Sequence, residues 1–185
     1  IAKGKGNKIE VLDSVIYPHS AGIFYTSLTQ YLGFHHYGDE YKVMGLAPYG
    51  EPKYVEELRQ VLKFKSNGLF ELDTKFFTHA KEGVSMSWEG GDPSIEPIFS
   101  NELEKLLGPA RKKGEELTQK HKDIATSVQR FTEELIFHIL NHLQSPNYFH
   151  IHDLNNNFYN FYTKITHFSS KKGDSGIVFG VWNTG

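Results

Sequence analysis

The sequence predicts an α/β fold in which helices and strands are mixed. Three observations support this: a β-branched run near the start, a hairpin pattern in the first half, and one long helical pattern further on. The chain has 185 residues, of which 38% are hydrophobic and 23% are charged. A chain of this size can form one globular domain that buries about 70% of its unfolded surface.

The chain is expected to begin with a strand, a short turn and a helix. The strand is predicted at Lys8–Ile16, where β-branched residues partly alternate with others and Pro18 follows. Ser20 can cap the helix that comes next, and Gly33 can close it. Within AGIFYTSLTQYLGF the residues that fall at helical spacing are Phe24, Leu28, Tyr31 and Leu32.

Two shorter helices are predicted after this one. The second spans Asp39 to about Ala47. The third begins at Pro52, because the first turn of a helix does not need the N–H that proline lacks. Its apolar stripe is formed by Val55, Leu58, Val61 and Leu62.

The clearest strand signal is VLKFKSNGLFELD. Asn67-Gly68 tolerates the positive φ angles of a tight turn, and hydrophobic residues alternate on both sides of it. This pattern predicts two antiparallel strands joined in a hairpin.

The segment Phe76–Pro97 is punctuated by glycine and proline, so it predicts a surface excursion. Ser100 is expected to cap a short helix that ends near Leu107, with Gly108-Pro109 as its stop. The mixed charges of Arg111–Lys122 predict a solvated connection.

The longest periodic element is Asp123–Leu143, and it predicts a core helix. Large apolar residues recur every three or four positions, so one face should be buried. Each such side chain contributes about 1.5–3 kcal/mol before its entropy is counted. These residues are Ile124, Val128, Phe131, Leu135, Ile139 and Leu143.

The character of the sequence changes after this helix. Residues 144–185 are rich in asparagine and aromatic residues and keep neither a helical nor a strand period. We therefore divide the chain into a domain at 1–143 and an atypical tail at 144–185. Gln144–Thr184 is expected to be less ordered than the preceding helix.

Composition and charge exclude several classes of function. The net charge of −2 argues against nucleic acid or an anionic membrane as a partner held by bulk charge. The absence of cysteine excludes disulfides, thiolate metal sites and thiol nucleophiles. No apolar run reaches the roughly 20 residues of a membrane span, and IAKGKGNK lacks the apolar core of a signal peptide. We expect a soluble, cytoplasmic protein, and a piece of a longer one because it starts at Ile1.

Four separated blocks resemble one family, in its order and at plausible spacing. They are YPHSAGIFYTSLTQYLGF, GDEYKVMGLAPYGEP, LGPAR and HKDIATSVQRFTEELI. The chain resembles the NodU/CmcH family of O-carbamoyltransferases over about Glu10–Leu143. The tail at 144–185 matches nothing in that family, so we interpret it as frame-shifted, as an unrelated fusion, or as too weakly similar to the family to be matched.

The resemblance implies a fold and an activity. It implies part of an N-terminal domain similar to the actin and heat-shock ATPase superfold. In the family, a smaller second domain makes carbamoyl-adenylate from carbamoyl phosphate and ATP. The first domain, with iron, then transfers the carbamoyl group to a hydroxyl of a small-molecule acceptor. The family's phosphate loop and iron ligands lie outside the matched region, so this fragment is expected to be inactive alone and to bind no cofactor tightly.

The stretch GDEYKVMG is the predicted nucleotide-contact region. A nucleotide needs a carboxylate for the ribose hydroxyls, a cation near the phosphoryl oxygens and backbone that can approach closely. We predict Asp39 and Glu40 as ribose-side contacts, Lys42 as the phosphoryl-side cation, and Gly38 and Gly45 beside them. Asp39 and Lys42 should share a helix face, with Glu40 about 100° away. The alternative is that the acidic residues complement the helix dipole and Lys42 is merely solvated.

Several histidines have a spacing that metal sites use, but no metal site is predicted. His138 and His142 are four apart on one helical face, and His150, His152 and Asp153 follow. No third ligand is fixed, and the family's iron histidines lie upstream of the match. His35-His36 are predicted to be loop residues and His19 a hydrogen-bonding residue near the helix start.

The second hypothesis for the chain is a stand-alone nucleotide-binding or interaction module, with the segment from Tyr148 to Phe168 packed on the helices or on a partner.

Overall fold

The computed structural model describes residues 1–89, 92–143 and 176–178. Helices and small antiparallel sheets are mixed in it, which confirms the predicted α/β class at that level. The helices within these residues are α1 (Ala21–Tyr31), α2 (Glu40–Leu46), α3 (Val55–Val61), α4 (His79–Glu82), α5 (Asn101–Leu107) and α6 (Gln119–Leu143), with 3₁₀ turns η1 (Ala47–Tyr49) and η2 (Thr74–Phe76).

Every strand pairing within the described residues is antiparallel. One sheet has the order β2-β1-β7, and two further pairs are β3-β4 and β5-β6. The strands are β1 (Ala2–Lys5), β2 (Lys8–Val11), β3 (Leu62–Phe64), β4 (Phe70–Leu72), β5 (Met86–Glu89), β6 (Asp92–Ile95) and β7 (Gly176–Val178).

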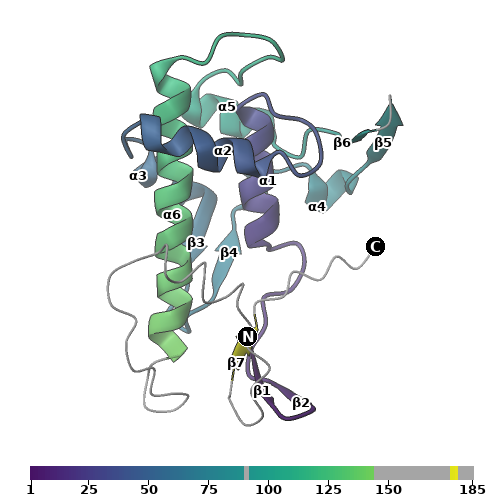
Figure 1. The fold of residues 1–185 in the computed structure, drawn as a ribbon, viewed down its shortest axis with the longest axis vertical. Coiled ribbons are helices and arrows are strands. Elements are labelled where there is room, and N and C mark those ends of the chain that lie inside the picture. Colours follow the sequence, from purple (N-terminus) through teal and green to yellow (C-terminus); the bar gives the residue numbers. More distant parts are fainter. Residues whose placement is uncertain (90–91, 144–175, 179–185) are drawn as a thin grey trace.

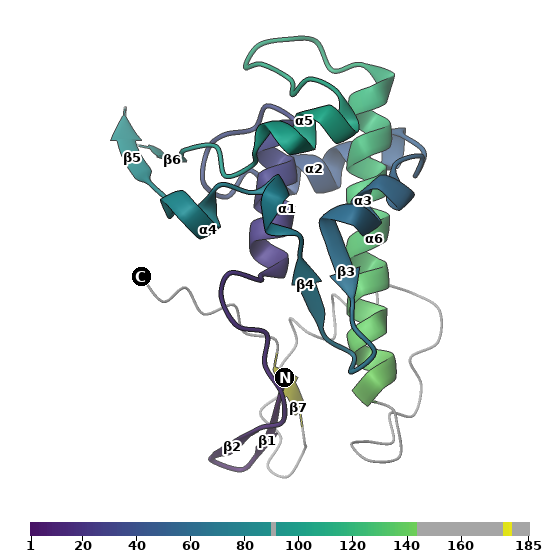
Figure 2. The ribbon, with the colours of Figure 1, turned by 180° about the vertical axis from the view of Figure 1, so that it is seen from behind.

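The core forms around α6, which runs along the long axis of the molecule (Figure 1). The predicted stripe of α6 is buried at Ile124, Val128, Phe131, Leu135 and Ile139. The Phe131 ring lies 5.6 Å from the ring of Phe24 on α1 and 5.3 Å from that of Phe64 on β3. Figure 2 shows the β3-β4 hairpin on the side of the molecule opposite to α2. The long helix therefore joins α1 and the hairpin into one apolar core.

The predicted caps and the hairpin are confirmed. Ser20 accepts a hydrogen bond from the N–H of Ile23 at 3.3 Å, and Ser100 caps α5 in the same way. In the hairpin, Leu62 pairs with Leu72 and Phe64 with Phe70. Gly68 has a φ of +76° there, which only glycine adopts without strain.

Three predicted boundaries were wrong. The strand predicted at Lys8–Ile16 ends at Val11, where its pairing with β1 stops. The third helix begins at Val55 instead of Pro52, because the preceding backbone N–H groups bond to α6 instead. The long helix begins at Gln119, so part of the predicted connection is helical.

The rest of the connection is not simply solvated. Arg111 donates a hydrogen bond to the carbonyl of Leu32 at 2.8 Å, and its guanidinium lies 5.3 Å from the Phe34 ring. The surface excursion after Phe76 contains α4 and the β5-β6 pair, and residues 81–88 are exposed. Apart from β7, the predicted tail lies outside the described residues. No helix in the described ranges is long and apolar enough to cross a membrane.

Candidate functional site

The stretch Gly38–Gly50 folds into a turn, α2 and η1. Gly38 has a φ of +88°, which suits the tight turn ahead of the helix. α2 crosses α1 and α6 near one end of the molecule (Figure 1), and it contacts both. The side chains of this stretch therefore reach surfaces of two other helices.

Asp39 and Lys42 form an ion pair at the start of α2. The carboxylate of Asp39 lies 2.7 Å from the Lys42 ammonium, and it also accepts the N–H of His36 at 3.2 Å. Asp39 is only 5% exposed. This confirms that the two residues share a helix face, and the ion pair occupies the carboxylate within the protein itself.

The Glu40 side chain lies on another side of α2 and contacts α1. Its Oε1 accepts a hydrogen bond from the Thr26 hydroxyl at 2.6 Å. Among the described residues Glu40 makes no ion pair, so its negative charge is not neutralised by a neighbouring cation. The two adjacent carboxylates are therefore in different environments.

A cavity of about 350 Å³ opens beside Glu40 between α1, α2 and α6. Across it, the Tyr25 hydroxyl donates to Gln129 Oε1 at 3.1 Å and ties α1 to α6. The described lining contains hydroxyl, amide and carboxylate groups with an apolar part, but no lysine or arginine. It comprises Gly22, Tyr25, Thr26, Glu40, Met44, Gln129, Thr132 and Ile136. Such a lining suits an uncharged group that carries hydroxyls, and it does not suit phosphate.

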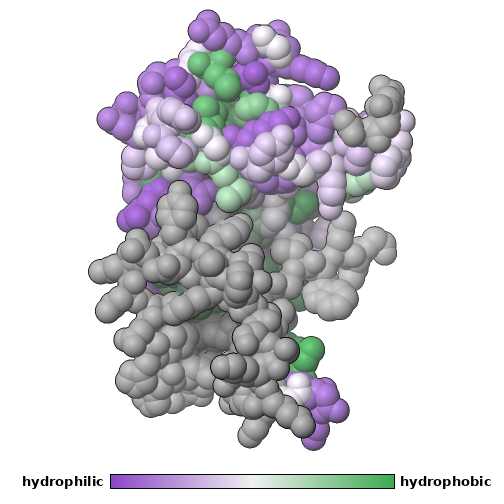
Figure 3. All heavy atoms as spheres, in the orientation of Figure 1, coloured by the Kyte–Doolittle hydropathy of each residue, from purple (hydrophilic) through white to green (hydrophobic). Residues whose placement is uncertain are grey.

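Glu133 adds a further acidic group near this cavity. Burial raises the pKa of its carboxyl, while hydrogen bonding to Gln129 and the charge of Arg130 act in the opposite direction. On the surface seen in Figure 3, the described part is largely hydrophilic, with small hydrophobic patches between the polar residues. The exposed surface of the cavity lining is itself mostly apolar, with a few polar groups.

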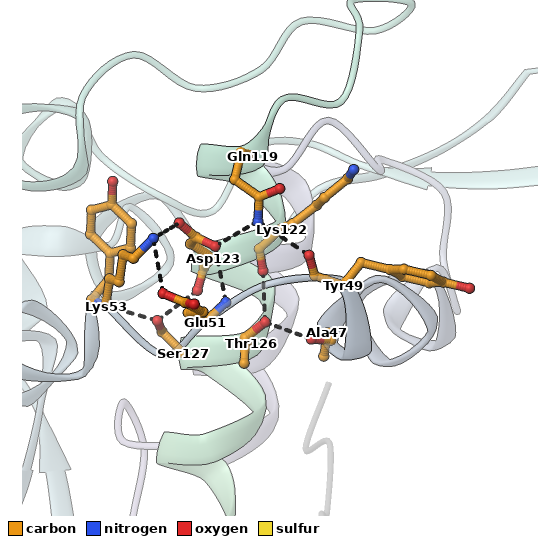
Figure 4. A network of polar contacts seen from close by, with 10 residues as sticks. Ala47, Tyr49, Glu51, Lys53, Gln119, Lys122, Asp123, Thr126 and Ser127 are labelled. Atoms are coloured by element: carbon orange, nitrogen blue, oxygen red, sulfur yellow. Dashed lines mark hydrogen bonds and ion pairs between the residues drawn. The ribbon is translucent and has the colours of Figure 1, made fainter.

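A second polar cluster joins the end of the motif to the first turns of α6 (Figure 4). Asp123 accepts hydrogen bonds from the backbone N–H of Glu51, from the Lys53 ammonium and from the Gln119 amide, at 2.9, 3.0 and 2.9 Å. These bonds, that from Gln119 first, lower the pKa of the Asp123 carboxyl from 3.8 to about 2.

Two hydroxyls of α6 extend this cluster. Thr126 donates to the carbonyl of Ala47, and Ser127 accepts the N–H of Tyr54 at 2.9 Å. Ser127 also donates to the carbonyl of Asp123 within the helix. Asp123, Thr126 and Ser127 together bond to four residues of the segment 47–54, so the cluster holds the segment that follows α2 against α6.

The glycines of the motif differ in their surroundings. A Cβ placed on Gly50 would lie 2.3 Å from the backbone of Lys122, so this glycine lets the chain pack closely on α6. A Cβ on Gly45 would meet nothing within 4 Å. Gly45 therefore leaves an open place on α2, and its role as a ligand contact stays a prediction.

His138 on α6 contacts the β3-β4 hairpin. The Nε2 of His138 lies 3.0 Å from the carbonyl oxygen of Lys65 and 3.1 Å from that of Leu69, and its ring stacks on Phe64. In residues 1–89, 92–143 and 176–178, no group of three His, Asp or Glu side chains is placed to hold a metal ion. His150, His152 and Asp153 lie outside these ranges.

Other histidines act as hydrogen-bonding groups. His19 accepts the N–H of Leu72 at 3.1 Å, which confirms its predicted role. His36 forms an isolated bridge to Ser94 within the loop that precedes α2, as a loop residue would. His79, which the sequence did not single out, is 1% exposed and contacts the carbonyl of Pro18 through Nε2.

The structure divides the predicted contact residues into two groups. Glu40 lines the cavity, whereas Asp39 and Lys42 form their own pair outside its lining. Thr26 and Gln129 were missed, because a lone polar residue within an amphipathic helix gives no local signal. Asp123 could have been noticed as an acidic residue at the start of a predicted helix.

Comparison with known proteins gives a consistent match. The family model described as carbamoyltransferase N-terminus matches residues 2–154. The uncharacterized protein sll1178 of Synechocystis is 37% identical over 140 residues, which cover 75% of this chain and 21% of that protein. Nodulation protein NolNO of Sinorhizobium fredii and nodulation protein NolO of Bradyrhizobium diazoefficiens are each 32% identical over 143 residues. The latter matches cover 77% of this chain and 18% and 22% of those proteins, so the chain spans about a fifth of the length of these relatives.

Proposed function

The chain belongs to the carbamoyltransferase N-terminal family, and on this premise we propose that it forms part of an O-carbamoyltransferase. The complete enzyme transfers a carbamoyl group from carbamoyl-adenylate, made from carbamoyl phosphate and ATP, to a hydroxyl of a small-molecule acceptor. In this proposal residues 1–143 are part of an actin-like ATPase domain. The observation that carries the proposal is the family match over residues 2–154, which includes every residue of the cavity.

The cavity is proposed to hold the nucleoside end of carbamoyl-adenylate. Glu40 offers a carboxylate to the ribose hydroxyls, and the apolar residues Met44 and Ile136 offer a surface to the base. The volume of about 350 Å³ lies within the range of small-molecule sites. The cavity lining contains no cation for the phosphoryl group, so that part of the ligand is expected to contact residues outside the cavity.

We still propose Lys42 as a phosphoryl contact, although its ammonium is already paired in this structure. Asp39 holds its ammonium at 2.7 Å, so a phosphoryl oxygen must share or replace that ion pair. In the family, iron assists carbamoyl transfer. The described residues do not fit an iron centre, because they hold no cluster of three suitable ligands. No step of the proposal therefore passes through a metal held by these residues.

A stand-alone nucleotide-binding or interaction module is the second candidate. It is favoured by the exposed aromatic side chains around α2, since Tyr37, Tyr41 and Tyr49 are 65%, 65% and 69% exposed. Large exposed apolar groups in one region mark a contact surface. The module would bind nucleotide or a partner but would not support transfer when placed in a complete enzyme.

A chimera distinguishes the two candidates. Residues 10–143 of this chain replace the matching segment of an active O-carbamoyltransferase of the family, and carbamoyl transfer to the acceptor is measured. We expect transfer, and a loss of about 10- to 100-fold in kcat/KM for the chimera with Glu40→Gln, the scale of one hydrogen bond to a charged group. Glu116→Gln, at an exposed glutamate, is the matched control. A folded chimera that binds ATP but transfers nothing would favour the module.

A further inference from the structure

Thr26 and Glu40 form a short hydrogen bond at the edge of the cavity. The Thr26 hydroxyl on α1 donates to Glu40 Oε1 on α2 at 2.6 Å. This length is typical of an O–H donor bound to an ionised carboxylate, and such bonds are roughly twice as strong as neutral ones. Both residues line the cavity.

The bond restricts a flexible side chain. Glutamate has several rotatable bonds, and holding it in one orientation costs entropy at the moment of ligand binding. Thr26 is β-branched and sits within a helix, so its own side chain has few rotamers. One carboxylate oxygen is thus fixed by a stiff neighbour. Among the described residues Glu40 has no other hydrogen bond or ion pair, so its remaining acceptor capacity is available to a ligand.

We propose that Thr26 is a positioning residue, which holds Glu40 so that the cavity distinguishes a ribose from a 2′-deoxyribose. The inference rests on the proposed function, because it takes the nucleoside as the ligand. A carboxylate can accept hydrogen bonds from two neighbouring hydroxyls. A site built to bind a hydroxyl rejects the analogue that lacks it, because an acceptor that the ligand covers is then left without its donor.

The other side chains of the cavity lining are less suited than Glu40 to accept hydrogen bonds from the ribose hydroxyls. Gln129 Oε1 already accepts the Tyr25 hydroxyl at 3.1 Å, and Gln129 also bonds to Glu133. The lining has no lysine or arginine that could draw the phosphates into the cavity instead. The charged acceptor with free capacity in this lining is Glu40, and Thr26 sets its direction.

The test is a titration of the 185-residue chain with adenosine and with 2′-deoxyadenosine, followed by NMR. The quantity compared is the ratio of the two dissociation constants, which a purely structural role of Thr26 would not change. In the parent chain we expect 2′-deoxyadenosine to bind about 10-fold or more weakly than adenosine. Thr26→Val should reduce the ratio to about twofold or less, since valine keeps the shape and loses the donor. Thr26→Ser, which restores the hydroxyl, should recover the ratio, and Thr74→Val is the control at an exposed threonine.

The outcomes separate this inference from the proposed function. Equal binding of the two nucleosides by the parent chain overturns the inference. So does a ratio that survives in Thr26→Val, and if Glu40→Gln nevertheless abolishes it, the proposed nucleoside site stands without a role for Thr26. If neither nucleoside shifts the signals of the cavity residues, the inference fails, whereas the proposed function is decided by the chimera, because a fragment of the enzyme is expected to bind nucleotide only weakly.

Discussion

At the scale of single residues, two adjacent carboxylates have different environments. Asp39 is buried and held by Lys42 and a backbone N–H, whereas Glu40 faces a cavity with one hydrogen bond from Thr26. The helical period correctly placed Asp39 and Lys42 on one face. It could not tell which carboxylate faces a ligand, because that depends on where α1 and α6 pack against α2.

The first prediction compares how much Asp39 and Lys42 each contribute to the free energy of unfolding. Asp39→Ala should lower the free energy of unfolding by about 1.5–3 kcal/mol, because the N–H of His36 and the Lys42 ammonium lose a charged partner. Lys42→Met should cost less, about 1 kcal/mol, because the buried Asp39 carboxylate that it leaves without a cation keeps the hydrogen bond from the N–H of His36. Urea denaturation of the parent and both variants measures this. Equal losses would mean that the pair matters only as a pair.

The second prediction concerns Asp123 and pH. The folded pKa of about 2 lies below the ordinary value of 3.8. The stabilisation that comes from ionised Asp123 is therefore complete above about pH 4 and is lost as the pH falls towards about 2. Unfolding measured between pH 5 and 2, at roughly half-unit steps, should show a steeper fall for the parent than for Asp123→Asn. Parallel curves would show that the carboxylate is not held by Gln119, Glu51 and Lys53 as described.

At the scale of elements, the helices and the hairpin were predictable and two of their starts were not. The period of α6 and the Asn67-Gly68 turn are local signals, and both predictions are confirmed. The predicted start at Pro52 failed because Asp123 and Ser127 bond the N–H groups of Glu51 and Tyr54. These partners are about 70 residues away in the chain, so no local pattern could show them.

The third prediction uses two glycines of the same stretch. Gly50→Ala should destabilise the protein by about 1–3 kcal/mol, because the new Cβ would overlap the Lys122 backbone, which cannot move freely within α6. Gly45→Ala is the matched variant. It lies within α2 with open space around it, so it should stabilise by about 0.4–1 kcal/mol through helix propensity and unfolded-state entropy. Thermal unfolding of both variants is the measurement, and a neutral Gly50→Ala would contradict the close packing of residues 47–54 on α6.

At the scale of the whole molecule, sequence reasoning identified the family and one residue of the cavity. The four blocks of sequence are far apart in the chain, and two of them meet in the Asp123 cluster. The cavity itself could not be predicted, because it is formed by three helices whose relative positions follow from packing in the core. The pairing of β7 with β1 was missed for a related reason, since it joins the two ends of the chain.

The last prediction is that the 185-residue chain transfers no carbamoyl group by itself. It spans about a fifth of the length of its relatives, and the described cavity provides neither a cation for phosphates nor a cluster of metal ligands. The chain should therefore bind ATP weakly, because the phosphates stay in water when the rest of the nucleotide site is missing. The assay supplies labelled carbamoyl phosphate, ATP, ferrous iron and a hydroxyl acceptor, with an active family enzyme as the positive control. Labelled acceptor above background would contradict the prediction, and it would mean that this segment contains the whole transfer machinery.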